Sequence, residues 1–266
     1  MSDSEVQSAP TAQSRHRILV RGSVQGVGFR PFIYRQATAL GLSGWVGNAT
    51  MGVIIEIQGD PRRIAALVRT IREAPPPNAV VEAVEAQKIE TRAESAFVIQ
   101  ESALTGARTA QMAPDLATCP ECLAEMFDPA NRRHRYPFIN CTQCGPRYSI
   151  IEDVPYDRTR TSMRHFPICA ACQAEYENPA DRRFHAEPNA CPDCGPSLTL
   201  WDATGTVLAV ADQALRGAAA AVRDGQIVAV KGIGGFHLIA DACNEATLGR
   251  LRARKRRAEK PFAVMF

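Results

Sequence analysis

The chain has 266 residues, of which 45% are hydrophobic, and a formal net charge of +3 at pH 7. This length allows two or three compact domains. The small charge does not single out nucleic acid as a partner, and the apolar runs are far shorter than the roughly 20 residues of a membrane span. Residues 1–14 are polar and lack a hydrophobic segment. We therefore expect a disordered tail, no membrane association and a cytoplasmic location.

Residues 15–102 have the pattern of an α+β domain. We expect strands at residues 17–22, 43–48, 53–58, 80–89 and 96–100, and helices at 31–40 and 61–73. Pro31 and Pro61 suit first helical turns, and Gly41 suits the residue after a helix end. The order β-α-β-β-α-β predicts a ferredoxin-like fold.

The loop before the first helix is the candidate site of this domain. Its glycines let backbone N–H groups approach a ligand, and the helix N-terminus adds partial positive charge. Arg30 adds a permanent planar cation with paired donors. The predicted phosphate-binding residues are Gln25, Gly26, Val27, Gly28, Phe29 and Arg30. A glycine loop before a helix is by itself usually a plain turn, but here Asn48 stands at the end of the next predicted strand.

Two motifs in this domain resemble the acylphosphatase family. Residues 22–30 match every fixed position of G-x-V-Q-G-V-x-F-R, and residues 44–52 match G-W-V-x-N-x3-G. The departure is Gly47, where stand-alone acylphosphatases usually carry a basic or larger residue. The resemblance implies that Arg30 holds an acyl phosphate and that Asn48 orients the attacking water. Because an acyl phosphate has a good leaving group, such positioning can suffice without a covalent nucleophile.

Residues 110–200 contain eight cysteines in four C-x-x-C pairs. The spacing C-x2-C-x18-C-x2-C occurs twice at an offset of 50 residues, which indicates an internal repeat. Two such turns can surround one metal ion with four thiolates. We therefore predict a double zinc-finger module with two structural Zn²⁺ sites and no open coordination position. The predicted ligands are Cys119, Cys122, Cys141, Cys144, Cys169, Cys172, Cys191 and Cys194.

The cysteine pattern leaves the ligand grouping open. The repeat favours the first four cysteines on one ion and the last four on the other, with an interleaved arrangement as the alternative. Disulfides, redox activity and an iron–sulfur cluster fit the pattern less well. The three histidines of this region, His134, His165 and His185, are expected to pack or face solvent.

Two arginine pairs of the repeat, Arg132/Arg133 and Arg182/Arg183, are candidates for contacts with RNA or DNA. We favour a solvated rim around the metal module, because the net charge is small and no interleaved aromatic platform is present.

Residues 206–266 predict the beginning of an α/β domain. A helix is expected at 211–223 and a buried strand at 226–231, followed by a glycine-rich segment and a basic helix. Basic side chains beside a glycine loop suit nucleotide phosphates, and a solvated basic face is the equally weighted alternative. Cys243 is expected to be a buried, small apolar residue. Because about 60 residues make a thin core and the chain ends on an apolar run, we expect a longer protein.

The order of these parts resembles the HypF family, the carbamoyltransferases that mature [NiFe] hydrogenases. Residues 138–147, 182–186, 231–238 and 251–261 carry the likeness beside the motifs above. The resemblance implies an α+β multidomain chain that ends in a truncated YrdC-like domain. The basic nucleotide-binding positions that it implies are Lys231, Lys255, Arg257 and Lys260.

The family's reaction implies a role for each part. The first domain would cleave carbamoyl phosphate to carbamate and phosphate. The YrdC-like domain would activate carbamate with Mg-dependent ATP as carbamoyl adenylate, and a further domain would pass the carbamoyl group to the C-terminal cysteine of HypE for cyanide synthesis. The chain would thus belong to an ATP-dependent carbamoyltransferase but perform only the acylphosphatase step. Binding of double-stranded RNA would rest on the YrdC analogy alone.

Three other functions remain open at this point. The first is a stand-alone acylphosphatase with a zinc-binding interaction module, against which the basic segment 232–260 counts. The second is a zinc-dependent nucleic-acid or protein adaptor that does not use Arg30. The third is a threonylcarbamoyl-tRNA enzyme, against which the two N-terminal modules argue.

Overall fold

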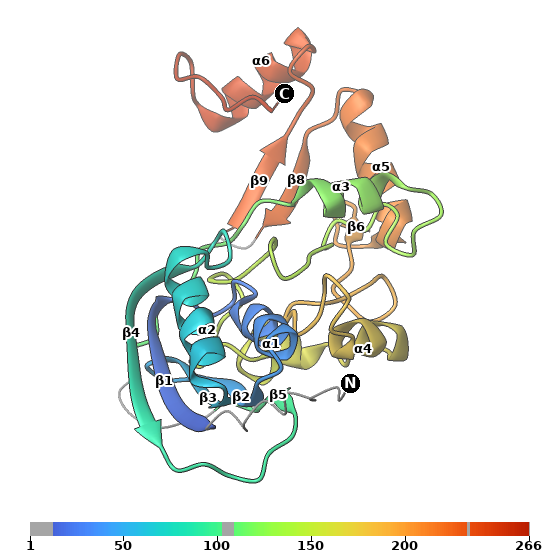
Figure 1. Ribbon diagram of the computed structural model, residues 1–266. Coiled ribbons are helices and arrows are strands. Elements are labelled where there is room, and N and C mark those ends of the chain that lie inside the picture. Colours follow the sequence, from blue (N-terminus) through green and yellow to red (C-terminus); the bar gives the residue numbers. More distant parts are fainter. Residues whose placement is uncertain (1–12, 103–108, 233–234, 266) are drawn as a thin grey trace, which may run out of the picture. The chain divides into compact units, whose positions relative to one another are not determined.

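The computed structural model describes residues 13–102, 109–232 and 235–265. Contacts divide the chain into two compact units, Met1–Gly195 and Pro196–Phe266 (Figure 1). Most of the expected tail, residues 1–12, and residues 233–234 of the glycine-rich segment lie outside the described residues. The domain boundaries 15–102, 110–200 and 206–266 stay predictions. In the described ranges, no helix is long and apolar enough to cross a membrane.

The first part of unit one has the expected β-α-β-β-α-β order, followed by a short fifth strand. Its strands form one sheet in the order β4-β1-β3-β2-β5, antiparallel except for the β2–β5 pair. The strands are β1 (Ser14–Ser23), β2 (Ser43–Ala49), β3 (Gly52–Gly59), β4 (Val80–Ile89) and β5 (Phe97–Ile99). The helices are α1 (Phe29–Ala39) and α2 (Pro61–Glu73). The predicted ferredoxin-like fold is confirmed.

Local signals explain where these elements begin and turn. The side chain of Asp60 caps α2 by accepting the N–H of Arg62 at 2.8 Å, and Pro61 occupies the first helical turn. Gly52 begins β3 with φ 145°, and a Cβ there would lie 2.2 Å from the carbonyl oxygen of Val20. Only glycine therefore allows β3 to approach β1 at this turn.

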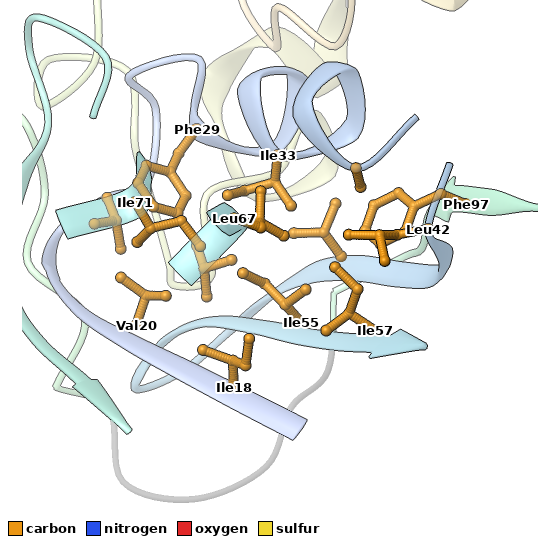
Figure 2. Close-up of a cluster of buried hydrophobic side chains, with 14 of the residues drawn as sticks. Ile18, Val20, Phe29, Ile33, Leu42, Ile55, Ile57, Leu67, Ile71 and Phe97 are labelled. Atoms are coloured by element: carbon orange, nitrogen blue, oxygen red, sulfur yellow. The ribbon is translucent and has the colours of Figure 1, made fainter. Parts of the chain in front are cut away.

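Both helices pack on one face of the sheet and enclose a hydrophobic core (Figure 2). The apolar positions of α2 that recur at helical spacing, Ile64, Leu67 and Ile71, are all buried. The strands contribute Ile18, Val20, Ile55 and Ile57, and α1 contributes Phe29 and Ile33. The core fixes α1 above β2, and so fixes the loop that leads into α1.

The second part of unit one contains the cysteines. It holds two helices of eight residues, α3 (Pro120–Phe127) and α4 (Ala170–Glu177), at equivalent positions of the repeat. Two 3₁₀ turns, η1 (Arg158–Arg160) and η2 (Ser162–His165), lie between them in the chain. Its apolar cluster is small, and cysteines provide several of its members together with Tyr136, Ile139 and Met163.

The described part of unit two contains two antiparallel strand pairs and two helices. Its elements are β6 (Thr199–Trp201), β7 (Val207–Val210), α5 (Ala211–Arg223), β8 (Val228–Gly232), β9 (Gly235–Ile239) and α6 (Glu245–Lys255). Within its described residues, the buried hydrophobic side chains are Ala214 and Leu251. The expectation for Cys243 is wrong, because it is exposed in the turn before α6, where its N–H donates to the Asp241 side chain at 2.8 Å.

Truncation of Leu67 tests the assignment of the core. Leu67 is fully buried between α2 and the sheet. We expect Leu67→Ala to lower the free energy of unfolding of this domain by about 2–5 kcal/mol, because the removed methyl groups leave a cavity. The measurement is urea unfolding followed by Trp45 fluorescence in a chain that also carries Trp201→Phe, which leaves one tryptophan. Leu208→Ala, at an exposed leucine of unit two, is the matched control and should leave the curve unchanged.

Candidate active site and metal centres

The eight predicted cysteine ligands gather in two clusters of four. In each cluster the sulfur atoms lie within 4.8 Å of one another, and neighbouring sulfurs are 3.6–3.8 Å apart. These distances exclude disulfide bonds, which are about 2.05 Å long. A tetrahedron with 2.3 Å Zn–S bonds has edges of about 3.8 Å, so the clusters fit zinc. The grouping is not interleaved: residues 119–144 supply one cluster and residues 169–194 the other.

Arginines of the first repeat contact the cluster of the second. Arg132 and Arg133 donate to the Sγ of Cys172 at 3.1 and 3.5 Å, and both bind the carboxylate of Glu175 on α4. Arg133 also donates to the carbonyl oxygen of Ala190 at 2.8 Å. Burial alone would raise the pKa of Glu175, but hydrogen bonds from Arg133 and Arg132 outweigh it and lower that pKa to about 2.

Arginines of the second repeat make corresponding contacts with the first repeat. Arg182 lies 3.5 Å from the Sγ of Cys122, and Arg182 and Arg183 both bind Glu125 on α3. A zinc ion with four thiolates would carry a formal charge of −2, and each pair of guanidinium groups would offset part of the charge of the opposite cluster. The expectation of a solvated rim is wrong for the second member of each pair, because Arg133 and Arg183 are buried.

The predicted phosphate loop leads into α1 as expected, and its glycines have positive φ angles, 72° at Gly26 and 73° at Gly28. Gln25 secures the loop in two directions. Its Nε2 donates to the carbonyl oxygens of Ala49 and Gly52 at 2.7 and 2.8 Å, and its Oε1 accepts the N–H of Tyr156 at 2.8 Å. The loop is therefore tied both to the β2–β3 turn and to the cysteine-containing module.

Arg30 lies in the first turn of α1 and Asn48 on β2, and both line the same small pocket. The guanidinium of Arg30 donates to Asp157 Oδ1 at 3.1 Å and to Glu187 Oε1. The Nδ2 of Asn48 donates to the carbonyl oxygen of Tyr156 at 2.9 Å. Both predicted catalytic side chains thus contact the cysteine-containing module.

Arg147 provides a further connection from the module to the loop. Its Nε donates to the carbonyl oxygen of Gly26, and its other guanidinium nitrogens donate to four carbonyl oxygens of the segment 141–146 at 2.8–3.2 Å. The side chain is buried. Because Arg147 donates hydrogen bonds both to the phosphate loop and to the segment 141–146, it fixes the loop relative to the turn that carries Cys141 and Cys144.

The pocket over the loop is small, and the module forms half of its lining. Its volume is about 20 Å³, the space of roughly one water molecule. The module contributes Thr142, Arg147, Tyr156, His185, Ala186, Glu187 and Pro188 to its lining. A phosphate group does not fit without a rearrangement of these side chains.

Burial dominates the electrostatics of this pocket. Burial acts to lower the pKa of Arg30, but the charges of Glu187 and Asp157 outweigh it and raise that pKa. Burial raises the pKa of the Glu187 carboxyl, with Arg30 acting in the opposite direction. Burial and the charge of Arg30 lower the pKa of His185 to about 4, so this imidazole is neutral near pH 7.

Sequence reasoning missed Tyr156, Asp157 and Glu187. The sequence carries no signal that singles out these residues. Glu187 stands where the first copy of the repeat has Pro137, but all seven positions from 134 to 140 differ from their counterparts at 184–190. Tyr156 and Asp157 lie between the two copies of the repeat.

The predicted nucleotide-binding residues lie in unit two: Lys231 on β8, Lys255 at the end of α6, and Arg257 and Lys260 in the segment after it. Lys231, Lys255 and Lys260 are exposed, and Arg257 is half-buried. The Nζ of Lys231 lies 5.5 Å from the centroid of the Phe236 ring, and Arg257 lies 5.7 Å from that of Phe262. Nucleotide binding by these residues stays a prediction.

Three protein-family models match successive parts of the chain, in the order that the sequence motifs predicted. Residues 16–99 match the acylphosphatase model, and residues 118–151 and 168–201 match the model described as HypF finger. Residues 220–266 match the Sua5/YciO/YrdC model, described as telomere recombination. An acylphosphatase of Caldivirga maquilingensis is 47% identical over 78 residues, which cover 81% of that protein. The fold, loop and motifs of the first domain are therefore those of an acylphosphatase-type domain, here joined to a double four-cysteine finger.

Longer relatives match the whole arrangement. The carbamoyltransferase HypF of Synechocystis is 52% identical over 249 residues, 94% of this chain and 32% of that protein. The carbamoyltransferase HypF2 of Cupriavidus necator is 54% identical over 253 residues and is covered to 31%. A crystal structure of full-length HypF in the phosphate- and nucleotide-bound form superposes with a TM-score of 0.86 at 42% identity, over 97% of this chain and 33% of that one. The chain belongs to the HypF family, and it spans about a third of the length of these relatives.

The crossed arginine contacts can be tested on Arg133. We expect Arg133→Met to weaken zinc binding by about 10–100-fold at the cluster of residues 169–194, because the variant removes charge and hydrogen bonds beside those thiolates. The cluster of residues 119–144, in the same repeat as Arg133, should be much less affected. The measurement is competition with a chelator, followed by alkylation of the released cysteines and mass spectrometry of the peptides.

The exposed Arg164 of η2 gives the matched control for Arg133→Met. Arg164→Met removes a positive charge from the same module, and neither cluster should lose metal faster. Equal weakening of both clusters by Arg133→Met would contradict a crossed role and would indicate general loosening of the module.

Proposed function

We propose that the pocket of Arg30 and Asn48 hydrolyses an acyl phosphate, with carbamoyl phosphate as the substrate. The observation that carries this proposal is the placement of both side chains in one pocket beside the N-terminus of α1. The first N–H groups of a helix have no acceptor inside the helix and favour an anion. The acylphosphatase match over residues 16–99 supports the same chemistry.

In this reaction Arg30 would bind the non-bridging oxygens of the phosphoryl group and offset their charge in the transition state. Because Tyr156 engages the Nδ2 of Asn48, the Oδ1 of Asn48 is the atom that would accept a hydrogen from the attacking water. The water oxygen bonds to phosphorus as the bond from phosphorus to the carbamate oxygen breaks. Carbamate leaves with the bonding electrons, and both protons of the water leave with inorganic phosphate as H2PO4⁻.

The two clusters would each hold one zinc ion with a structural role. The spacing of the sulfurs and the all-thiolate donor set support this assignment. Four protein ligands complete the coordination of each ion, so the ions would crosslink the module and leave the reaction to Arg30, Asn48 and the loop.

For the whole protein we propose an ATP-dependent carbamoyltransferase of [NiFe]-hydrogenase maturation. Carbamate would be activated with Mg-ATP as carbamoyl adenylate by a YrdC-like domain that includes residues 220–266, and then transferred to the C-terminal cysteine of HypE. The identity of 52–54% to carbamoyltransferases of the HypF family supports this assignment. We place the reaction in the cytoplasm, which agrees with nine cysteines that form no disulfide.

Replacement of the two catalytic candidates tests the proposal. We expect the chain to release phosphate from carbamoyl phosphate, and Arg30→Ala and Asn48→Ala each to lose on the order of a hundredfold or more in kcat/KM, the usual effect of removing one charge-stabilising group. The exposed Arg62→Ala is the control and should retain activity. A zinc adaptor without enzymatic function predicts that all four proteins are equally inactive.

Arg30→Lys separates catalysis from folding in this test. Alanine would leave the carboxylates of Asp157 and Glu187 without their cation, which can destabilise the module by about 3–5 kcal/mol. Lysine keeps the charge but loses the planar pair of donors. We expect Arg30→Lys to keep two zinc ions per chain and still to lose most activity, whereas full activity of this variant would contradict the role of Arg30.

A further inference from the structure

Arg30 is paired with two carboxylates at the position where the substrate phosphate is expected. Its side chain is 9% exposed, and the side chains of Glu187 and Asp157 are 3% and 21% exposed. One guanidinium thus faces two carboxylates in a nearly dry site. Such a site disfavours a further anion, since like charges repel strongly where water is excluded. A phosphate must therefore displace at least one carboxylate from Arg30.

The contacts of Glu187 distinguish its two carboxylate oxygens. Oε1 accepts from Arg30, whereas Oε2 accepts the backbone N–H of Arg158 at 2.9 Å. The hydroxyl of Tyr176 lies 3.3 Å from each oxygen. If Oε1 is released from Arg30, the carboxylate still has the N–H of Arg158 and the hydroxyl of Tyr176. It can release Arg30 and still keep hydrogen-bond donors at its carboxylate.

The backbone around Glu187 is independently fixed. The guanidinium of Arg158 donates to the carbonyl oxygens of Glu187, Asn189 and Phe166 at 2.7–2.8 Å. These bonds involve neither Arg30 nor the phosphate loop. Replacement of Glu187 by phosphate at Arg30 therefore requires a rotation of the Glu187 side chain and not a displacement of the module.

We propose that Glu187 sets the phosphate affinity of this site by competing with phosphate for Arg30. In this structure its carboxylate holds Arg30 and lines the pocket. The phosphoryl group of the substrate displaces it, and its return assists release of inorganic phosphate after hydrolysis. This inference rests on the proposed function of the pocket and adds a residue of the finger module to it.

Binding of inorganic phosphate to the zinc-loaded chain tests the competition directly, by isothermal titration calorimetry. Glu187→Gln keeps the size of the side chain and can still accept hydrogen bonds from Arg158 and Tyr176, but it loses the charge that holds Arg30. We expect phosphate to bind about tenfold or more tightly, the worth of one hydrogen bond to a charged group. Product inhibition by phosphate in the hydrolysis assay should strengthen by the same factor.

Two further variants make the result decisive. Glu177→Gln, at an exposed glutamate of α4, is the same change in the same module and should leave phosphate affinity unchanged. Asp157→Asn removes the other carboxylate and should also tighten binding, so it carries the test if Glu187→Gln does not fold with two zinc ions. Phosphate affinity that is unchanged or weaker in the folded Glu187→Gln and Asp157→Asn variants would overturn the proposal and leave both carboxylates a structural role.

The parent chain distinguishes failure of this inference from failure of the proposed function. If the parent chain binds phosphate and hydrolyses acyl phosphate, but the variants bind phosphate no more tightly, only the role of Glu187 is contradicted. A zinc-loaded parent that neither binds phosphate nor hydrolyses acyl phosphates contradicts the proposed function, and the competition with it.

Discussion

The two four-cysteine clusters are the constraint on which the candidate active site depends. The module residues that line the pocket or contact Arg30 are Thr142, Arg147, Tyr156, Asp157, His185, Ala186, Glu187 and Pro188. These residues belong to a module with a small apolar cluster, in which cysteines are prominent members. Closure of each cluster around an ion would supply the rigidity that such a small core lacks. The metal sites and the candidate active site are therefore parts of one structure.

Buried polar contacts transmit this rigidity to the phosphate loop. Gln25, Asn48 and Arg147 are all buried, and each bonds across the boundary between the acylphosphatase-type domain and the finger module. Buried polar groups are costly when they lose their partners, so such a network specifies one relative position of the two parts. The finger module consequently contributes side chains to the pocket over the loop.

The sequence predicted those features that depend on local signals. The ends of α2 follow from Asp60 and Pro61 and from the prolines after it. The two motifs single out Arg30 and Asn48, which line one pocket, and their catalytic role stays a prediction. The partners of these two residues could not be predicted in the same way. Asn48 bonds to a residue 108 positions away and Arg30 to one 157 positions away, and neither partner carries a local signal.

The misread arginines show the same limitation. In the sequence, Arg132 and Arg133 are two adjacent charges in a polar segment, which normally indicates solvent exposure. Arg133 is buried because its partners, Glu175 and the carbonyl oxygen of Ala190, belong to the other copy of the repeat. The repeat was visible in the sequence, but the exchange of partners between its copies exists only in the folded chain.

This exchange has a consequence for the evolution of the module. A single copy would have four thiolates to bind a metal but no arginine pair for them, and its own Arg–Arg pair would face no carboxylate and no cluster. Two identical copies related by a twofold axis would satisfy each other, as protomers do in an isologous dimer. A homodimer of a single finger would already make all of these contacts between two chains, so gene duplication and fusion would join the two fingers without the loss of any of them.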